Sequence, residues 1–393
     1  MQINISKRAN SAGLFFIILS CFFIPFSTSL MGTTALLGCL CWLFTGKPLS
    51  LPRLMVINPP VLLSILLLIL LSAGLFYSPA PLKDAFAVLK KYRELLFFAI
   101  VLSLFTSSKR AATIAENSFF AGCCLLLVVS YGIYFSLIPM EKLGYSVVHH
   151  ITHSFFMAIL AFWCLHRSFH QKRYLYLALF SLTTINLFFI APGRTGMLIY
   201  IILITLTAYQ RLSLKKSILA TILIAILIAA TFMLSHNFSS RVSTAIQEIK
   251  TYHSSSSRTS LGMRFDWWRN SVDLIAEKPF FGHGIGSFLP AQKKLIQRQK
   301  KHTKISDNPH NEYLFIGVQA GFIGMVLFIA LLTTQVIYSF RLKTPQKYLL
   351  QGVTMAMACG CLMNSFLFDS HQGHFFAIIS AILMVPTIAK GTG

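Results

Sequence analysis

Two arginines and one histidine of this chain have side chains suited to handling a phosphate group and a proton. Arg194 lies in a Pro-Gly-Arg-Thr-Gly turn, and Arg264 lies in a Gly-Met-Arg-Phe-Asp-Trp-Trp segment. Planar guanidinium groups bind two phosphate oxygens at once, so both arginines are candidates for holding a phosphate-bearing substrate. His310 follows an Asn-Pro turn, where a neutral imidazole is able to take a proton from a hydroxyl group.

Each of these residues has a simpler alternative, which the sequence leaves open. Arg264 fits an ordinary exposed residue of a helix, and His310 fits a histidine that caps one. For Arg194 a functional role is the favoured interpretation, because proline and glycine leave its backbone irregular between two apolar segments. Trp268 lies four residues after Arg264 on the same predicted helix face, and Asn311 follows His310, so both join the candidates for substrate binding.

Other candidates for substrate binding lie near the ends of apolar segments. Lys91 and Arg93 are charged residues early in such a segment, where a site and simple snorkelling to the interface are equal alternatives. His150 and His153 begin another segment with a spacing that suits a metal. No acidic partner is near them in sequence, so histidines at a membrane interface are the favoured interpretation. Asp369 is a lone acid in a turn and is a further candidate.

The sequence contains no familiar motif for metal, nucleotide or serine chemistry. It has no D-x-D cluster, G-x-S-x-G or Walker A sequence, and no zinc motif, so neither a metal nor a cofactor is predicted. The Gly-His-Gly-Ile-Gly segment at 282–286 follows no predicted strand, which favours a tight turn over a phosphate-binding loop. The basic run at 293–304 is interpreted as a solvated, mobile segment, with contact to anionic headgroups as the alternative.

The composition assigns the chain to a class of proteins. Of its 393 residues, 55% are hydrophobic and only 11% are charged, and the mean hydropathy is +0.68. A soluble domain carries about a quarter charged residues, so these values predict an all-α polytopic membrane protein. The net charge of +23 does not require a nucleic-acid partner, because cytoplasmic loops of membrane proteins accumulate lysine and arginine.

Apolar segments long enough to approach the roughly 30 Å of a bilayer core recur along the chain. Basic residues gather in alternate loops, which puts both termini in the cytoplasm and the long polar segment at about 238–313 outside. We therefore expect transmembrane helices 1–9 within 1–234, an outer loop with short helices at 235–312, and transmembrane helices 10–12 within 313–393. The twelve predicted spans are about 12–30, 32–45, 57–75, 85–105, 111–138, 149–166, 174–191, 195–209, 216–234, 313–339, 347–368 and 373–389.

The long outer loop has its own local signals. Residues 241–250 are predicted to form a short helix that continues from the ninth span, and apolar spacing predicts a second helix at 264–277. Between them, residues 253–258 contain four consecutive serines, which predicts a mobile link.

Taken together and in this order, the motifs resemble those of the O-antigen ligase and polymerase superfamily. They are the Gly-Arg-Thr-Gly turn at Arg194, Arg264 with Trp268, the Lys-Pro-Phe-Phe-Gly-His-Gly-Ile-Gly-Ser-Phe segment at 278–288, and Asn-Pro-His-Asn-Glu-Tyr-Leu at 308–314. The resemblance extends over nearly the whole chain in topology, with the large outer loop before the tenth span. One departure is Gly193, where many members have serine.

The resemblance implies a GT-C-like, metal-independent glycosyltransferase with the pyrophosphate held by Arg194 and Arg264 and the acceptor activated by His310. Ligases of this family transfer a polysaccharide from undecaprenyl pyrophosphate to a sugar of lipid A-core on the periplasmic side of a Gram-negative inner membrane, here with expected inversion. The histidines at 149–153 resemble a histidine-rich start of the corresponding span in ligases. Two alternatives remain: an O-antigen polymerase or protein O-oligosaccharyltransferase of the same superfamily, and a flippase for lipid-linked glycans. A flippase would need charges along several mid-span helices, whereas most charges here lie at span ends or in the loop.

Overall fold

The computed structural model describes residues 2–139, 145–171, 174–252, 259–300 and 303–388, and these form helices and turns without a β-strand. The serine run at 253–258 lies outside the described residues, so its predicted mobility is not addressed. The helices up to residue 134 are α1 (Gln2–Phe23), α2 (Thr28–Leu43), η1 (Lys47–Ser50), α3 (Leu51–Ile57), α4 (Pro59–Ala73), η2 (Gly74–Phe76), α5 (Leu82–Lys91), α6 (Glu94–Phe105) and α7 (Lys109–Tyr134).

The second part of the chain contributes the remaining helices. They are α8 (His150–Gln171), α9 (Tyr174–Ile185), the π-helical turn η3 (Asn186–Ile190), α10 (Arg194–Arg211), α11 (Leu214–Leu234), α12 (His236–Lys250), α13 (Ser260–Glu277), α14 (Phe288–Gln299), α15 (Glu312–Ser339), α16 (Gln346–Met363) and α17 (Ser370–Ile388).

Apolar helices dominate, as the composition predicts. Among the described residues, four helices are long and apolar enough to cross a membrane: Pro59–Phe76, Lys109–Tyr134, Leu214–Leu234 and Glu312–Ser339. A fifth span results if the bent pair Thr28–Leu43 and Lys47–Ile57 is counted as one. Helix α11 leaves nearly all of its apolar surface uncovered by the rest of the protein, since only 6% of its most apolar stretch is buried. A helix this apolar and this exposed requires an apolar solvent, which is typical of a multi-pass membrane protein.

Each predicted span coincides with helical structure, but the number of membrane crossings remains a prediction. The fourth predicted span, 85–105, is not a single helix: it breaks at Tyr92 and Arg93 into α5 and α6. Helix α5 has only 10 residues and carries Lys83, Lys90 and Lys91 beside exposed Leu82 and Phe86, so it is amphipathic and too short to cross a membrane by itself. Lys91 and Arg93 therefore lie at the end of a short helix.

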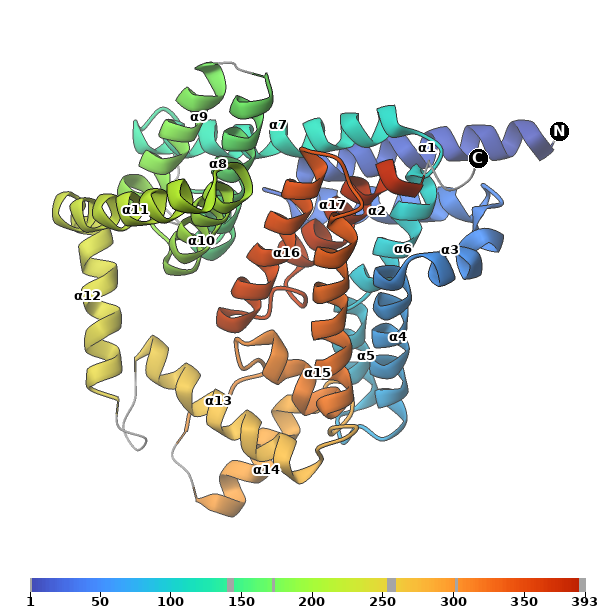
Figure 1. Cartoon of the computed structure of the whole chain (residues 1–393). Helices are drawn as coiled ribbons and strands as arrows, with labels where there is room; N and C mark the ends of the chain where they lie inside the picture. The colour runs from blue at the N-terminus through green and yellow to red at the C-terminus, as the bar shows by residue number, and fades with distance from the viewer. Residues whose placement is uncertain (1, 140–144, 172–173, 253–258, 301–302, 389–393) are drawn as a thin grey trace.

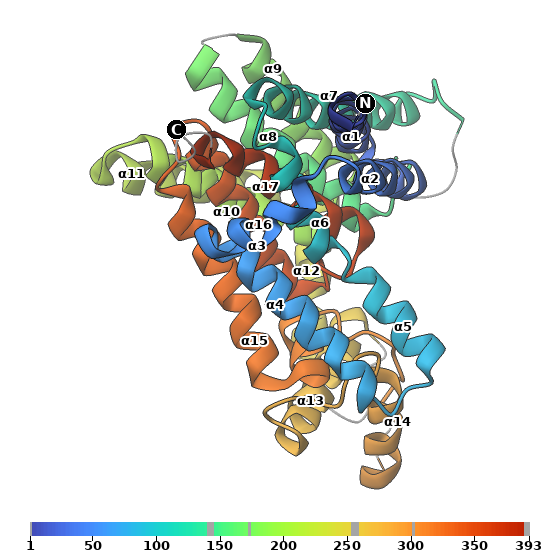
Figure 2. The same ribbon diagram turned by 90° about the vertical axis from the view of Figure 1, so that its right-hand side faces the viewer.

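The helices of the predicted outer loop lie beside the lower end of a central group of helices (Figure 1). In Figures 1 and 2, α1, α2 and α7 lie across the top of the molecule, and α4 and α15 run downwards side by side. Helix α12 descends on the left of Figure 1, and α13 leads from it towards α14. Helix α13 confirms the predicted helix at 264–277 and begins earlier, because the Thr259 hydroxyl accepts the Gly262 N–H at 3.2 Å. Helix α14 makes the first half of the basic run helical.

The Gly-His-Gly-Ile-Gly segment at 282–286 binds this loop to helix α15 by hydrogen bonds. The N–H groups of His283 and Gly284 donate to the carbonyls of Val318 and Gln319 at 2.7 and 3.0 Å, where α15 is kinked at Gly321. The N–H of Gly286 donates to the Gln319 side chain at 2.8 Å. These N–H groups are used within the protein, so the segment is a tight structural turn, as favoured from sequence.

Candidate functional site

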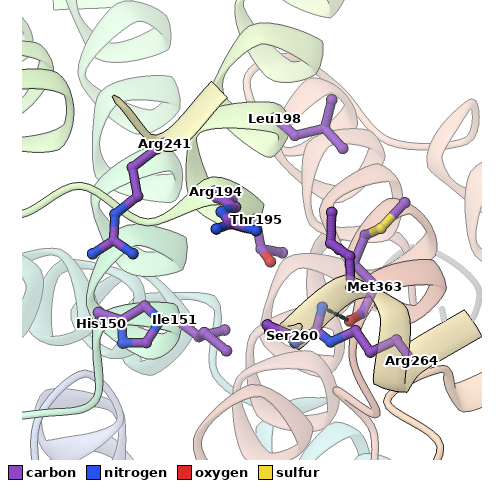
Figure 3. A pocket seen from close by; sticks show the side chains of 10 residues that line it. His150, Ile151, Arg194, Thr195, Leu198, Arg241, Ser260, Arg264 and Met363 are labelled. Atoms are coloured by element: carbon purple, nitrogen blue, oxygen red, sulfur yellow. Dashed lines mark hydrogen bonds between the residues drawn. The ribbon is translucent and has the colours of Figure 1, made fainter. Parts of the chain in front are cut away.

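A cavity of about 310 Å³ lies where the first turns of α8, α10 and α13 meet α12 and the end of α16. Figure 3 shows Arg241 and His150 on one side of it and Arg264 with Met363 on the other, with Arg194 between them. No carboxylate is among its lining residues, so three guanidinium groups and an imidazole face one space. Such a concentration of positive charge is suited to an anion with several oxygens. The lining residues are His150, Ile151, Arg194, Thr195, Leu198, Arg241, Ser260, Leu261, Arg264 and Met363.

Arg194 is placed by the close approach of α10 to α8. A Cβ on Gly196 would lie 2.3 Å from the Ser154 backbone carbon, and one on Gly193 would lie 2.2 Å from the Ser154 hydroxyl oxygen. Glycine at both positions therefore lets the two helices touch, and it explains why residue 193 is not serine here. Arg194 is the first residue of α10, and its side chain keeps 32% of its surface exposed.

Glu248 of α12 fixes the direction of that side chain. Its Oε2 atom lies 3.2 Å from Nη1 of Arg194 and also accepts the N–H of Leu261 at 3.2 Å. One carboxylate thus joins the start of α10 to the first turn of α13. Sequence reasoning missed Glu248 and also Arg241, which lie seven residues apart and so share one face of α12. This spacing is the feature of the sequence that could have identified both residues as members of one site.

Arg264 is anchored at the opposite side of the cavity. Its Nη1 donates to the carbonyl of Met363 at 2.9 Å, and Nη2 donates to Oδ1 of Asn364 at 3.2 Å. Asn364 in turn donates to the hydroxyl of Thr195 at 3.1 Å, next to Arg194. Burial, with the positive charge of Arg194 as a smaller contribution, lowers the pKa of Arg264. The two arginines repel each other, so an anion between them would relieve this repulsion.

His310 lies beside this cavity and does not line it. Its backbone has a left-handed φ of 53°, and its N–H donates to the Asn308 side chain at 2.8 Å. The imidazole lies against the ring of Trp267, with centroids 5.4 Å apart. Burial lowers its pKa to about 4, and the positive charge of Arg264 contributes in the same direction. The ring is therefore neutral near pH 7, the state in which it accepts a proton.

Two more predicted residues hold the His310 loop in place. Trp268 donates its indole N–H to the carbonyl of Pro309 at 2.9 Å. Asn311 caps α15 by accepting the N–H of Leu314 at 3.0 Å, and its amide donates to the carbonyl of Leu362 at 3.0 Å. Both side chains therefore contact protein backbone beside the cavity.

The other predicted residues fall into separate places. His150 lines the cavity, but His153 is buried, and its ring nitrogens lie 2.8 Å from Ser146 Oγ and from Asn186 Oδ1. Lys91 covers the ring of Phe368 at 4.1 Å, next to Asp369. Burial raises the pKa of Asp369 to about 6, although Lys91 acts against this shift.

Arg93 donates to the carbonyl of Lys90 at 3.0 Å. Neither Arg93 nor the pair of Lys91 and Asp369 lines the cavity formed by Arg194, Arg241 and Arg264, which is called the arginine cavity below. In the described ranges, no three His, Cys, Asp or Glu side chains are grouped so that they could hold a metal ion.

Near Lys91 lies the buried carboxylate of Glu312, which is part of the Asn-Pro-His-Asn-Glu-Tyr-Leu motif at 308–314. Glu312 is fully buried, and its Oε1 accepts the Tyr92 hydroxyl at 2.9 Å. Its Oε2 accepts the N–H groups of Leu367 and Phe368, each at 3.0 Å. Glu312 thus ties the start of α15 to the α5–α6 break and to the turn before α17. The His310 loop therefore sits on a rigid base.

The part of the chain that holds these residues is similar to known proteins. A family model described as O-antigen ligase matches residues 176–329, a range that includes Arg194, Arg264 and His310. An uncharacterized protein of Haemophilus influenzae is 29% identical over 133 residues, which cover 32% of this chain and 33% of that protein. The chain thus matches about a third of the length of this relative. The match over α9 to α15 supports membership of the O-antigen ligase/polymerase superfamily.

Proposed function

We propose that the chain is a glycosyltransferase that moves an O-antigen polysaccharide from undecaprenyl pyrophosphate to a sugar of lipid A-core. The observation that carries the proposal is the cavity in which Arg194, Arg241 and Arg264 converge, with the neutral ring of His310 packed on Trp267, three residues after Arg264. In this proposal the protein is a multi-pass protein of a Gram-negative inner membrane, with a GT-C-like fold, cytoplasmic termini and a periplasmic site. Its partners are the lipid-linked donor, the lipid A-core acceptor and the surrounding lipids.

The arginine cavity is the proposed donor site. A diphosphate carries its charge on oxygens that planar guanidinium groups bind in pairs. The three arginines act on the charge that develops as the diphosphate departs, and Glu248 and Asn364 already hold two of them in position. Preoriented donors stabilise a leaving group because they need no rearrangement during the reaction.

His310 is the proposed general base. Its neutral ring accepts the proton of an acceptor hydroxyl while the hydroxyl oxygen attacks the anomeric carbon of the donor sugar. The bond from that carbon to the pyrophosphate oxygen breaks, and its electron pair leaves with undecaprenyl pyrophosphate. Attack from the face opposite the leaving group inverts the configuration. Arg264 and Trp267 lie three residues apart on α13, so the cavity and the His310 ring are neighbours along one helix face.

The direct test offers the purified, reconstituted protein an undecaprenyl-pyrophosphate-linked glycan together with lipid A-core. Glycan appearing on lipid A-core supports the ligase function, whereas a lengthened donor supports a polymerase. The variants Arg194→Ala, Arg264→Ala and His310→Ala are expected to insert normally and to lose transfer. Near-normal transfer by all three would discard the proposal.

A further inference from the structure

A second cavity, of about 410 Å³, lies between α5, the start of α14 and the residues that lead to His310. It shares no lining residue with the arginine cavity. Helix α13 starts at the arginine cavity and runs towards α14, which forms part of the second one (Figure 1). The residues that line the second cavity are Ala80, Pro81, Asp84, Ala87, Val88, Gly286, Phe288, Leu289, Pro290, Lys293, Asp307 and Phe315.

The walls of this cavity are fixed by backbone contacts between distant parts of the chain. A Cβ on Gly286 would lie 2.8 Å from Cα of Ala85, so glycine is required where the turn touches α5. The Ser78 hydroxyl donates to the carbonyl of Ile285 at 2.7 Å. Phe288 and Phe315 are buried, and their rings meet edge to face at 5.8 Å. The cavity is therefore already formed without a ligand.

The polar lining is mixed and converges from three elements. Asp84 comes from the first turn of α5, Lys293 from α14, and Asp307 from the loop before α15. Carboxylates accept hydrogen bonds from sugar hydroxyl groups, and an ammonium group donates to phosphate. Both flanking helices carry further basic residues, which make this part of the protein positively charged: Lys83, Lys90 and Lys91 on α5, and Lys294 and Arg298 on α14. A ligand with hydroxyl groups and negative charge fits this set.

Asp307 connects the cavity to the proposed base. It lies three residues before His310, and its negative charge acts on the imidazole against the effect of burial. Its neighbour Asn308 accepts both the His310 N–H, at 2.8 Å, and the Ser365 hydroxyl, at 2.7 Å. A sugar bound against Asp307 would thus lie beside a loop whose geometry is already set.

We infer that this second cavity is the acceptor subsite, which binds a phosphate-bearing sugar of the glycolipid headgroup beside His310. The inference rests on the proposed glycosyl transfer and adds where its acceptor binds. Lys293 holds the phosphate group, and Asp84 and Asp307 hold hydroxyl groups. The donor and the acceptor then reach the loop from two separate cavities.

The first test compares two adjacent lysines in the full-length protein, with saturating donor and varied lipid A-core. Lys293 lines the cavity, whereas the exposed neighbour Lys294 does not. Lys293→Ala is expected to raise the acceptor KM about tenfold, because a charge-assisted contact is lost, and to leave the donor KM unchanged. Lys294→Ala removes the same charge and is expected to change the acceptor KM less than about twofold. Equal effects of the two substitutions would overturn the inference, because they would show general attraction only.

Dephosphorylated lipid A-core provides the matching change in the ligand. With this acceptor, Lys293→Ala and the unmodified protein are expected to have the same KM. A tenfold difference that persists would mean that Lys293 does not bind the phosphate, and this also overturns the inference. Phosphorylated core oligosaccharide without its lipid separates the sources of the phosphate: it should show the same Lys293 dependence if the headgroup alone is recognised. If the acceptor KM of this oligosaccharide did not depend on Lys293, the dependence would belong to the lipid-bound form and not to this cavity.

A filling substitution tests the space itself. Ala87→Trp places a large ring in the cavity from the exposed side of α5 and should raise the acceptor KM, while donor binding and the melting temperature stay unchanged. A normal acceptor KM in this variant would sink the inference. If the unmodified protein transfers nothing to lipid A-core, the proposed function fails. The second cavity can then still be tested by direct binding of fluorescent lipid A-core to the Lys293→Ala and Lys294→Ala variants. Weaker binding to Lys293→Ala alone would support the cavity as a binding site, and equal binding would contradict it.

Discussion

The indole of Trp267 lies against the imidazole of His310, with ring centroids 5.4 Å apart and planes tilted by 31°. The indole N–H donates to the carbonyl of Lys304 at 2.7 Å, so Trp267 also holds the segment that leads to the histidine. This contact connects α13, which carries Arg264, to the loop that carries the proposed base.

Trp267 is therefore predicted to be a positioning residue for His310. Trp267→Ala should lower kcat about 10- to 100-fold, because a misplaced base loses most of its contribution, while the donor KM changes little. Trp267→Phe keeps a ring against the imidazole and should recover most of the lost rate. Steady-state kinetics with both substrates check this split. A large rise in donor KM with normal kcat would contradict the positioning role.

The pH dependence of transfer should reflect the lowered pKa of His310. Burial and the positive charge of Arg264 bring this pKa to about 4, so the ring is neutral and active above that pH. The rate at saturating donor should fall as the pH drops through about 4, because protonation removes the base. In Arg264→Gln, which is itself expected to lose transfer, the pKa of His310 followed by NMR titration should move upwards, since a neighbouring positive charge is lost. A midpoint near 6.5 in the unmodified protein would show that the ring lies in a more solvated place.

Sequence alone located the helices of this chain better than the contacts between them. The helix at 264–277 follows from apolar spacing within one stretch of chain, and α13 contains it. The break between α5 and α6 was missed, because the predicted span 85–105 was judged by its average hydropathy. Tyr92 at the break is fixed by Glu312, which is 220 residues away and invisible to local pattern.

The same distinction applies to the candidate site. Arg194 and Arg264 were chosen by side-chain type and turn chemistry, and both line the cavity. Arg241 and Glu248 were missed, because a charged residue on an amphipathic helix resembles a solvated one until its neighbours are known. His153 was chosen with His150 by spacing, but one turn of α8 separates a residue that lines the cavity from one that is buried.

Arg241 is predicted to contribute to donor binding. It lines the cavity from α12, and its loss should raise the donor KM about tenfold, as expected for one charge-assisted contact to a phosphate. Lys250→Ala, at the end of the same helix, removes the same charge away from the lining and serves as the matched control. Measuring donor KM in both variants distinguishes a specific contact from general attraction. Equal values for the two variants would remove Arg241 from the site.

Transfer is predicted to continue when divalent ions are removed. Three guanidinium groups supply the positive charge that a diphosphate leaving group needs, so a metal ion is not required by the proposed chemistry. Product formation in excess EDTA should equal that in untreated protein. A loss that added Mg²⁺ restores would count against this scheme.

The buried carboxylate of Glu312 is predicted to stabilise the fold on which the His310 loop rests. It accepts three hydrogen bonds, from the Tyr92 hydroxyl and from the backbone N–H groups of Leu367 and Phe368. Glu312→Ala would leave these donors buried without an acceptor, at a cost of about 3 kcal/mol or more, and should lower the melting temperature markedly. Tyr92→Phe removes one donor only and should cost about 1 kcal/mol. Melting temperatures measured in the same detergent compare the stability of the two variants with that of the unmodified protein. A Glu312→Ala protein as stable as Tyr92→Phe would show that the three contacts contribute little, and that α15 is held in place by apolar packing.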